Sequence, residues 1–126
     1  MVGIVLVSHS KAVAESVEEL TKMMAPEAAT AAAGGMEDGG FGTSFERIQN
    51  AIDAVYSPDG VIVLMDMGSA VMTTEMVIEM KGEDNIRMAD CPFVEGAVMA
   101  TVGAQSGMSL DEILNELREV GSTPKF

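Results

Sequence analysis

The chain has 126 residues, of which 48% are hydrophobic and 21% are charged, as is typical of one globular domain spanning residues 1–126. The formal net charge of −13 repels nucleic acid and anionic lipid, and it suits a protein partner with a basic face. The one cysteine, Cys91, has no partner for an internal disulfide, and no Cys/His cluster is present to bind zinc. The apolar start, Met1–Val7, is too short for a signal peptide or a membrane span. We therefore expect a cytoplasmic protein without a metal site, a cofactor, a nucleic-acid partner or a membrane partner.

Apolar runs alternate with amphipathic stretches, a pattern that predicts repeated βα units and a parallel sheet. The first strand is predicted over Val2–Val7, which is rich in β-branched residues. Apolar residues at helical spacing predict a helix over Lys11–Met24, and Pro26 ends it. A second strand is predicted over Ala28–Ala33, mainly from its position before Gly34-Gly35, because alanine itself favours helix.

The glycine-rich and acidic segment Met36–Gly42 is expected to be an exposed loop. Thr43 or Ser44 is placed to cap a helix over Phe45–Val55. The clearest strand of the chain follows at Val61–Met65. The remaining predicted elements are a helix over Val71–Met80, a strand over Ile86–Met88, a helix over Phe93–Gln105, and a helix over Leu110–Glu119 that Ser109 caps.

Two junctions between a strand and a helix carry polar side chains. Ser8-His9-Ser10 follows the first strand, and Asp66 follows the third. In a doubly wound sheet, ligands bind at the carboxyl ends of strands, where the strand order reverses. Right-handed crossovers allow the first strand to run between the second and the third, in the order 2-1-3-4. This order would place His9 beside Asp66.

A histidine next to a carboxylate is suited to phosphoryl transfer. An imidazole attacks through its unprotonated nitrogen, and a carboxylate that accepts the proton of the other nitrogen fixes the tautomer. His9 and Asp66 are therefore the catalytic candidates. The transferred group also needs hydrogen-bond donors, which helix starts and hydroxyls provide. The candidate phosphate-binding residues are Ser10, Thr43, Gly68 and Ser69.

Taken alone, these residues leave simpler interpretations open. A histidine that follows a strand is more often an ordinary loop residue, and Asp66 is equally suited to cap a helix. The 12 methionines are expected to be adaptable core residues rather than cofactor contacts. No Gly-Lys-Ser/Thr loop is present, which disfavours a nucleotide- or flavin-binding domain.

Several motifs, taken in order over residues 2 to 107, resemble a known family. They are Gly3–Ser10, Ala33–Gly35, Asp38-Gly39, Gly42–Ser44, Val63–Ala70, Glu75-Met76 and Pro92–Ala97. These segments are similar to the phosphotransferase subunits of bacterial dihydroxyacetone kinase, the DhaM family. The fold of that family resembles the mannose-type IIA domains of the phosphoenolpyruvate-dependent phosphotransferase system. The resemblance implies a doubly wound α/β fold with a mainly parallel four-stranded sheet and helices on both faces.

The resemblance also implies a phosphotransferase function. His9 would be the phosphorylated residue. It would receive the phosphoryl group from the phosphocarrier protein HPr and pass it to ADP held on the DhaL subunit. DhaL would then phosphorylate dihydroxyacetone bound on the DhaK subunit. Asp66 matches the aspartate that orients the histidine in mannose-type IIA domains, and family members are typically homodimers. Two positions depart from the family pattern: Thr73 stands where asparagine is expected, and Cys91 where a small apolar residue is more usual.

Two other functions stay open at this stage. A mannose-type IIA subunit of a sugar transporter is disfavoured by Gly68-Ser69-Ala70, because sugar IIA domains more often have Gly-Gly-Ser-Pro after the aspartate. A non-enzymatic regulatory module that binds a kinase subunit or a transcription factor would not need His9. The sequence also leaves open which imidazole nitrogen would carry the phosphate.

Overall fold

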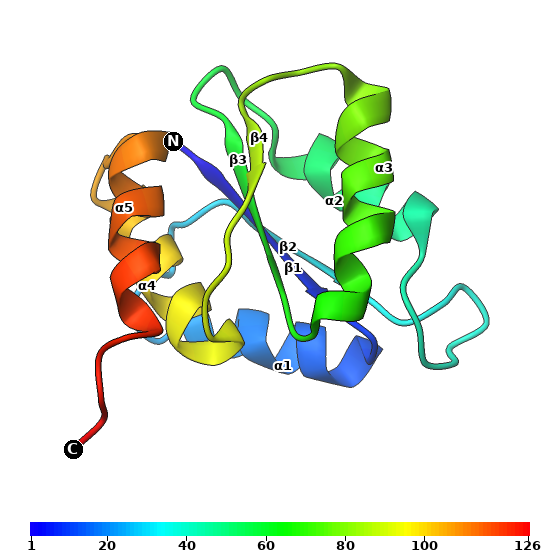
Figure 1. Cartoon of the computed structure of the whole chain (residues 1–126), viewed down its shortest axis with the longest axis horizontal. Coiled ribbons are helices and arrows are strands. Elements are labelled where there is room, and N and C mark those ends of the chain that lie inside the picture. The colour runs from blue at the N-terminus through cyan, green and yellow to red at the C-terminus, as the bar shows by residue number, and fades with distance from the viewer.

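A parallel sheet lies between two layers of helices in the computed structural model, which describes all 126 residues (Figure 1). Its strands are β1 (Gly3–Ser8), β2 (Thr30–Gly34), β3 (Val61–Met65) and β4 (Ile86–Met88). They lie in the order β2-β1-β3-β4, which confirms the predicted order 2-1-3-4. The helices are α1 (Lys11–Thr21), α2 (Phe45–Val55), α3 (Val71–Lys81), α4 (Phe93–Gln105) and α5 (Leu110–Val120), and a 3₁₀ turn, η1 (Gly68–Ala70), leads into α3.

Helices α2 and α3 cover one face of the sheet, and α1, α4 and α5 cover the other (Figure 1). The two faces have separate cores because side chains alternate along each strand. In β1, Ile4 and Leu6 pack toward α4 and α5, whereas Val5 and Val7 pack toward α2. Covering both faces is what requires β1 and β3 to be apolar at nearly every position. None of the helices combines the length and the apolar character that crossing a bilayer requires.

Five elements have boundaries that differ from the sequence prediction. Strand β1 lies one residue later than the predicted Val2–Val7, and α3 and α5 each end one residue later than predicted. The two larger differences are in α1 and β2. Helix α1 ends at Thr21 rather than Met24, and the Thr21 hydroxyl, which is buried, donates a hydrogen bond to the carbonyl of Glu18 at 2.7 Å. The second strand runs over Thr30–Gly34 rather than Ala28–Ala33. Its register pairs Thr30 with Ile4 and Gly34 with Ser8, so pairing with β1 sets its limits.

Side-chain caps fix the starts of three helices. Ser44, rather than Thr43, is the N-cap of α2, and its Oγ accepts a hydrogen bond from the Arg47 N–H at 3.2 Å. Ser109 caps α5 in a reciprocal capping box with Glu112. Ser10 is the N-cap of α1, so the chain enters this helix immediately after His9.

The expectation that the methionines are core residues is wrong for eight of them. Helix α3 packs through Thr74 and Val77, and no other element covers its outward face. The exposed methionines are Met1, Met23, Met24, Met67, Met72, Met76, Met80 and Met99. Helix α3 therefore has apolar residues on its exposed side as well as on its buried side, so its apolar residues cannot all be assigned to the core.

Candidate functional site

The carboxyl ends of β1 and β3 bring His9 and Asp66 together. Val7 pairs with Met65 in the sheet, so the residues that follow this pair leave the sheet side by side. The Asp66 N–H donates a hydrogen bond to the Val7 carbonyl at 3.1 Å and continues the pairing by one residue. The His9 ring then lies with Nδ1 3.0 Å from Oδ1 of Asp66. The adjacency expected from the strand order is thus present in the structure.

The second oxygen of Asp66 accepts two further hydrogen bonds. The His9 N–H donates to Oδ2 at 3.0 Å, and the hydroxyl of Ser8 donates to it at 2.8 Å. Burial of the carboxyl group raises its pKa, but the His9 N–H, the His9 ring and the Ser8 hydroxyl together outweigh this effect. The pKa of Asp66 is therefore held below its ordinary value, and the group is a carboxylate at neutral pH.

This carboxylate determines the tautomer of the neutral His9 ring. An ionised carboxylate only accepts hydrogen bonds, so Nδ1 must carry the proton that joins it to Asp66. The lone pair then resides on Nε2, where the hydroxyl of Ser69 lies 2.8 Å away as a donor. The His9 side chain is 22% exposed, so the nucleophilic nitrogen is within reach of a molecule at the surface.

Of the four candidate phosphate-binding residues, only Ser69 is hydrogen-bonded to the His9 side chain. Gly68 lies at the start of η1, and a Cβ at this position would meet no atom within 4 Å, so the backbone is openly accessible. Thr43 shares a hydrogen bond of 3.2 Å with Thr73, and the neighbouring Gly42 N–H donates to the His9 carbonyl at 2.8 Å. The loop that contains Thr43 therefore lies beside His9, and no hydrogen bond joins the Thr43 hydroxyl to the ring.

Ser10 has a local structural role instead. Its Oγ accepts a hydrogen bond from the Val13 N–H at 3.3 Å, and its own N–H donates to the hydroxyl of Ser8 at 3.0 Å. The backbone donor at this position is thus already engaged within the protein.

Ser8 is a residue of the site to which the sequence analysis assigned no role. It is fully buried, and its hydroxyl links the Ser10 N–H to the Asp66 carboxylate. The sequence analysis placed Ser8 after the first strand, whereas it is the last residue of β1, next to the strand that ends before Asp66. Thr73, which the sequence analysis noted as a departure from the expected asparagine, makes a polar contact with Thr43.

Two surface cavities of similar size have different relations to this site. One, of about 520 Å³, lies directly beside Asp66 and is lined by Met65, Met67 and Cys91 among others.

Burial, with a contribution from the Asp90 carboxylate, raises the pKa of the Cys91 thiol to about 11, so the thiol is protonated at neutral pH. No group of three or more His, Cys, Asp or Glu side chains is arranged to hold a metal ion.

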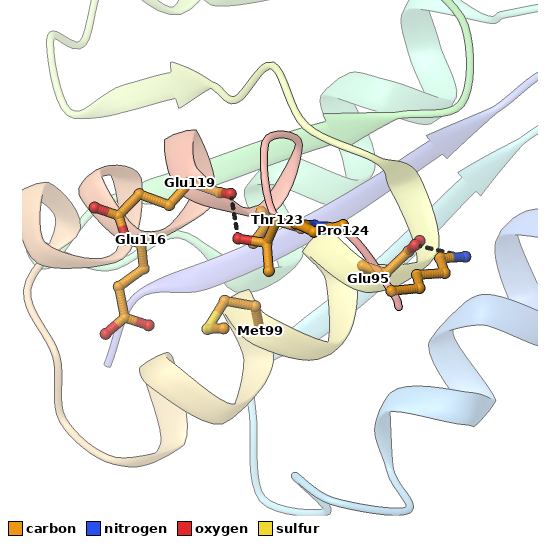
Figure 2. A pocket seen from close by; sticks show the side chains of 8 residues that line it. Glu95, Met99, Glu116, Glu119, Thr123 and Pro124 are labelled. Carbon is orange, nitrogen blue, oxygen red and sulfur yellow. Dashed lines mark hydrogen bonds and ion pairs between the residues drawn. The ribbon is translucent and has the colours of Figure 1, made fainter.

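The other cavity, of about 530 Å³, lies between α4, α5 and the segment that follows α5 (Figure 2). Glu95, Glu116 and Glu119 line it, and Lys125 is paired with Glu95 at 3.0 Å. With its one cation paired and three acids around it, this cavity is unsuited to a phosphate. None of its lining residues belongs to the elements that carry His9 and Asp66.

Comparison with known proteins agrees with this geometry. The sequence matches the family of PTS system fructose IIA components (EIIA-man) over residues 3–114. The phosphotransferase subunit DhaM of the PTS-dependent dihydroxyacetone kinase of Lactococcus lactis is 34% identical over 118 residues, which cover 94% of each chain. The phosphoryl donor subunit DhaM of dihydroxyacetone kinase 1 of Listeria innocua is 36% identical with the same coverage. The Escherichia coli DhaM is also 36% identical, but the chain spans only 26% of that protein.

Solved structures show the same fold. A protein of unknown function superposes with a TM-score of 0.83 at 28% identity, over 97% of this chain and 96% of the other. The mannose/sorbose-specific IIA subunit of Enterococcus faecalis, at 20% identity, superposes with a TM-score of 0.57 over 98% of this chain and 93% of its own. The chain therefore belongs to the mannose-type IIA family of the phosphotransferase system. Within that family it is similar to DhaM subunits over nearly its whole length.

Proposed function

We propose that residues 1–126 act as a phosphohistidine carrier domain of the phosphotransferase system. In this proposal His9 accepts a phosphoryl group from HPr and transfers it to ADP on a DhaL subunit, which phosphorylates dihydroxyacetone on DhaK. The observation that carries the proposal is the hydrogen bond between His9 Nδ1 and Asp66, which leaves the lone pair on the accessible Nε2. The relatives that are named as DhaM subunits support the choice of acceptor.

The geometry suggests a sequence of steps at His9. Nε2 of the neutral ring attacks the phosphorus of the donor, and the bond to the donor's leaving nitrogen breaks as the new N–P bond forms. The ring acquires positive charge while its Nδ1 proton stays hydrogen-bonded to Asp66, so the carboxylate stabilises the product without taking the proton. The Ser69 hydroxyl, which donates to Nε2 in the free protein, turns to a phosphoryl oxygen. Attack by a phosphate oxygen of ADP reverses these changes.

The proposal is tested by following the phosphate from donor to acceptor. The protein is incubated with phosphoenolpyruvate, enzyme I and HPr, and the phosphorylated form is then mixed with ADP-bound DhaL or with a sugar-transporter IIB subunit. We expect an acid-labile phosphate that is absent from the His9→Ala variant and that passes to DhaL–ADP. Failure of the wild-type protein to take up phosphate would refute the carrier function.

A sugar-transporter IIA subunit is the second candidate. It is favoured by the family match, because that family is described as a fructose IIA component. Transfer to IIB but not to DhaL–ADP would establish this alternative.

For either acceptor we propose that the protein is a cytoplasmic homodimer. Sedimentation of the purified protein tests the oligomeric state.

A further inference from the structure

Exposed methionines begin beside His9 and continue along α3. Met67 precedes η1, in which Ser69 contacts the His9 ring. Met72 lies three residues after Ser69, and Met76 lies one helical turn further along the same side of α3. These three methionine side chains are 54%, 74% and 57% exposed. The phosphoryl-transfer steps described above use none of them.

An exposed aromatic residue lies in the loop that is hydrogen-bonded to the His9 backbone. Phe41, at the end of the glycine-rich loop, is 87% exposed. The next residue, Gly42, is hydrogen-bonded to the His9 carbonyl, and Thr43 is hydrogen-bonded to Thr73 of α3. The loop and the helix are thereby joined next to the site. Large apolar side chains gathered around one accessible nucleophile differ from apolar residues scattered singly over a surface, and they indicate an interaction site.

Acidic residues surround these apolar side chains. Glu75 and Glu79 lie next to the methionines on α3, Asp38 lies in the loop before Phe41, and Asp90 lines the same cavity as Met67. Two lysines of this region are paired within the chain, since Lys81 contacts Asp53 and Lys11 lies 4.0 Å from Glu15. The surface therefore has an apolar centre with acidic residues around it.

We propose that Phe41, Met67, Met72 and Met76 form a docking surface for the protein that donates the phosphoryl group to His9. The partner that fits this surface presents an apolar patch bordered by Lys and Arg side chains. This inference rests on the proposed carrier function. A second copy of the chain fits less well, because self-association would bring two acidic rims together and cover His9. Flexible methionine side chains also allow the surface to adapt to its partner.

The test compares two pairs of methionines with nearly identical exposure. The variant Met72→Ser/Met76→Ser removes the docking surface on α3, where the side chains are 74% and 57% exposed. The control Met23→Ser/Met24→Ser alters side chains that are 72% and 57% exposed. The control residues follow the far end of α1, which runs away from His9 for about 17 Å. Both variants remove the same atoms from the surface.

Each variant is phosphorylated by two donors, phosphorylated HPr and the small molecule phosphoramidate. We expect the KM for phosphorylated HPr to rise about tenfold in Met72→Ser/Met76→Ser, because a few apolar anchors dominate the binding energy of an interface. Phosphoramidate needs no docking surface, so its rate should stay within about twofold of wild type. The control variant should match wild type with both donors.

Three results would overturn the inference. An unchanged KM for phosphorylated HPr would show that the methionines do not bind the donor, and it would leave the carrier function intact. Dissociation of a wild-type dimer by Met72→Ser/Met76→Ser, seen in sedimentation, would show that the surface joins two copies of the chain. Failure of both donors to phosphorylate wild-type His9 would refute the carrier function and, with it, the docking surface.

Discussion

Asp66 accepts three hydrogen bonds, and each has a different consequence for His9. The bond from Nδ1 fixes the ring tautomer, the bond from the His9 N–H fixes the backbone, and the bond from Ser8 fixes the carboxylate itself. Because Asp66 is at the end of a strand, its orientation depends on these donors rather than on a helix cap. The site is thus a small network whose members can be removed one at a time.

Asp66→Asn tests the fixing of the tautomer. An amide that keeps its oxygen toward Ser8 and the His9 N–H turns its NH₂ group toward Nδ1, which moves the ring proton to Nε2. We expect a folded protein whose transfer from phosphorylated HPr is slowed by about a hundredfold or more, as when a triad aspartate is replaced. Stopped-flow or quench-flow transfer rates measure the effect. Transfer at the wild-type rate would show that Asp66 does not orient the ring.

Ser8→Ala tests the positioning of the carboxylate. The change removes one donor to Asp66 and leaves the Ser10 N–H without its acceptor, so we expect a loss of about 1–3 kcal/mol in the free energy of unfolding. The Ser8 hydroxyl lowers the pKa of Asp66, so its removal should shift the acid limb of the transfer rate to higher pH. Loss of stability with an unchanged pH profile would limit Ser8 to a structural role.

Among the secondary-structure elements, β2 and α1 flank β1, which carries His9 at its end. The sequence predicted α1 from apolar residues at helical spacing, and β2 mainly from its position before Gly34-Gly35. It misplaced the limits of β2 because alanine carries no strong strand preference. Pairing with β1 supplies the missing information, which is tertiary. At the end of β2, Gly34 lies against the start of α1, and a Cβ there would lie 2.5 Å from the Ser10 carbonyl oxygen and 2.7 Å from Lys11 Cα.

Gly34→Ala tests this close contact between elements. The added Cβ would meet backbone atoms of Ser10 and Lys11, which cannot move apart without shifting α1. We therefore expect a loss of about 1–3 kcal/mol in the free energy of unfolding, measured by urea denaturation. Gly121→Ala serves as the control, because it has a φ of −69° and its added Cβ would make an ordinary contact of 3.5 Å with Pro92. Equal stability of the two variants would contradict the packing of Gly34 against α1.

Strand order and the pairing of His9 with Asp66 followed from elementary rules, because each residue directly follows a strongly apolar strand. The role of Ser8 did not follow, since one serine hydroxyl in a polar turn has many possible partners until the register is known. The exposure of the α3 methionines was also missed. Methionine is equally compatible with a core and with an adaptable surface, and only the packing of α3 distinguishes the two.

The whole molecule carries a net charge of −13, which should govern how fast a donor protein finds it. Attraction to a basic face is screened by salt, so we expect kcat/KM for phosphorylated HPr to fall about tenfold between about 0.05 M and 0.5 M NaCl. Anionic phosphoramidate is repelled, and its rate should stay constant or rise over the same range. A fall with both donors would point to a general effect of salt on the site.

The most direct test of the account is the position of the phosphate on the His9 ring. Protein with nitrogen-labelled histidine is phosphorylated through enzyme I and HPr and studied by phosphorus–nitrogen correlation NMR. Because Nδ1 is held by Asp66 at 3.0 Å, the account predicts a single phosphate bonded to Nε2. Phosphate on Nδ1, or on any residue other than His9, would contradict it.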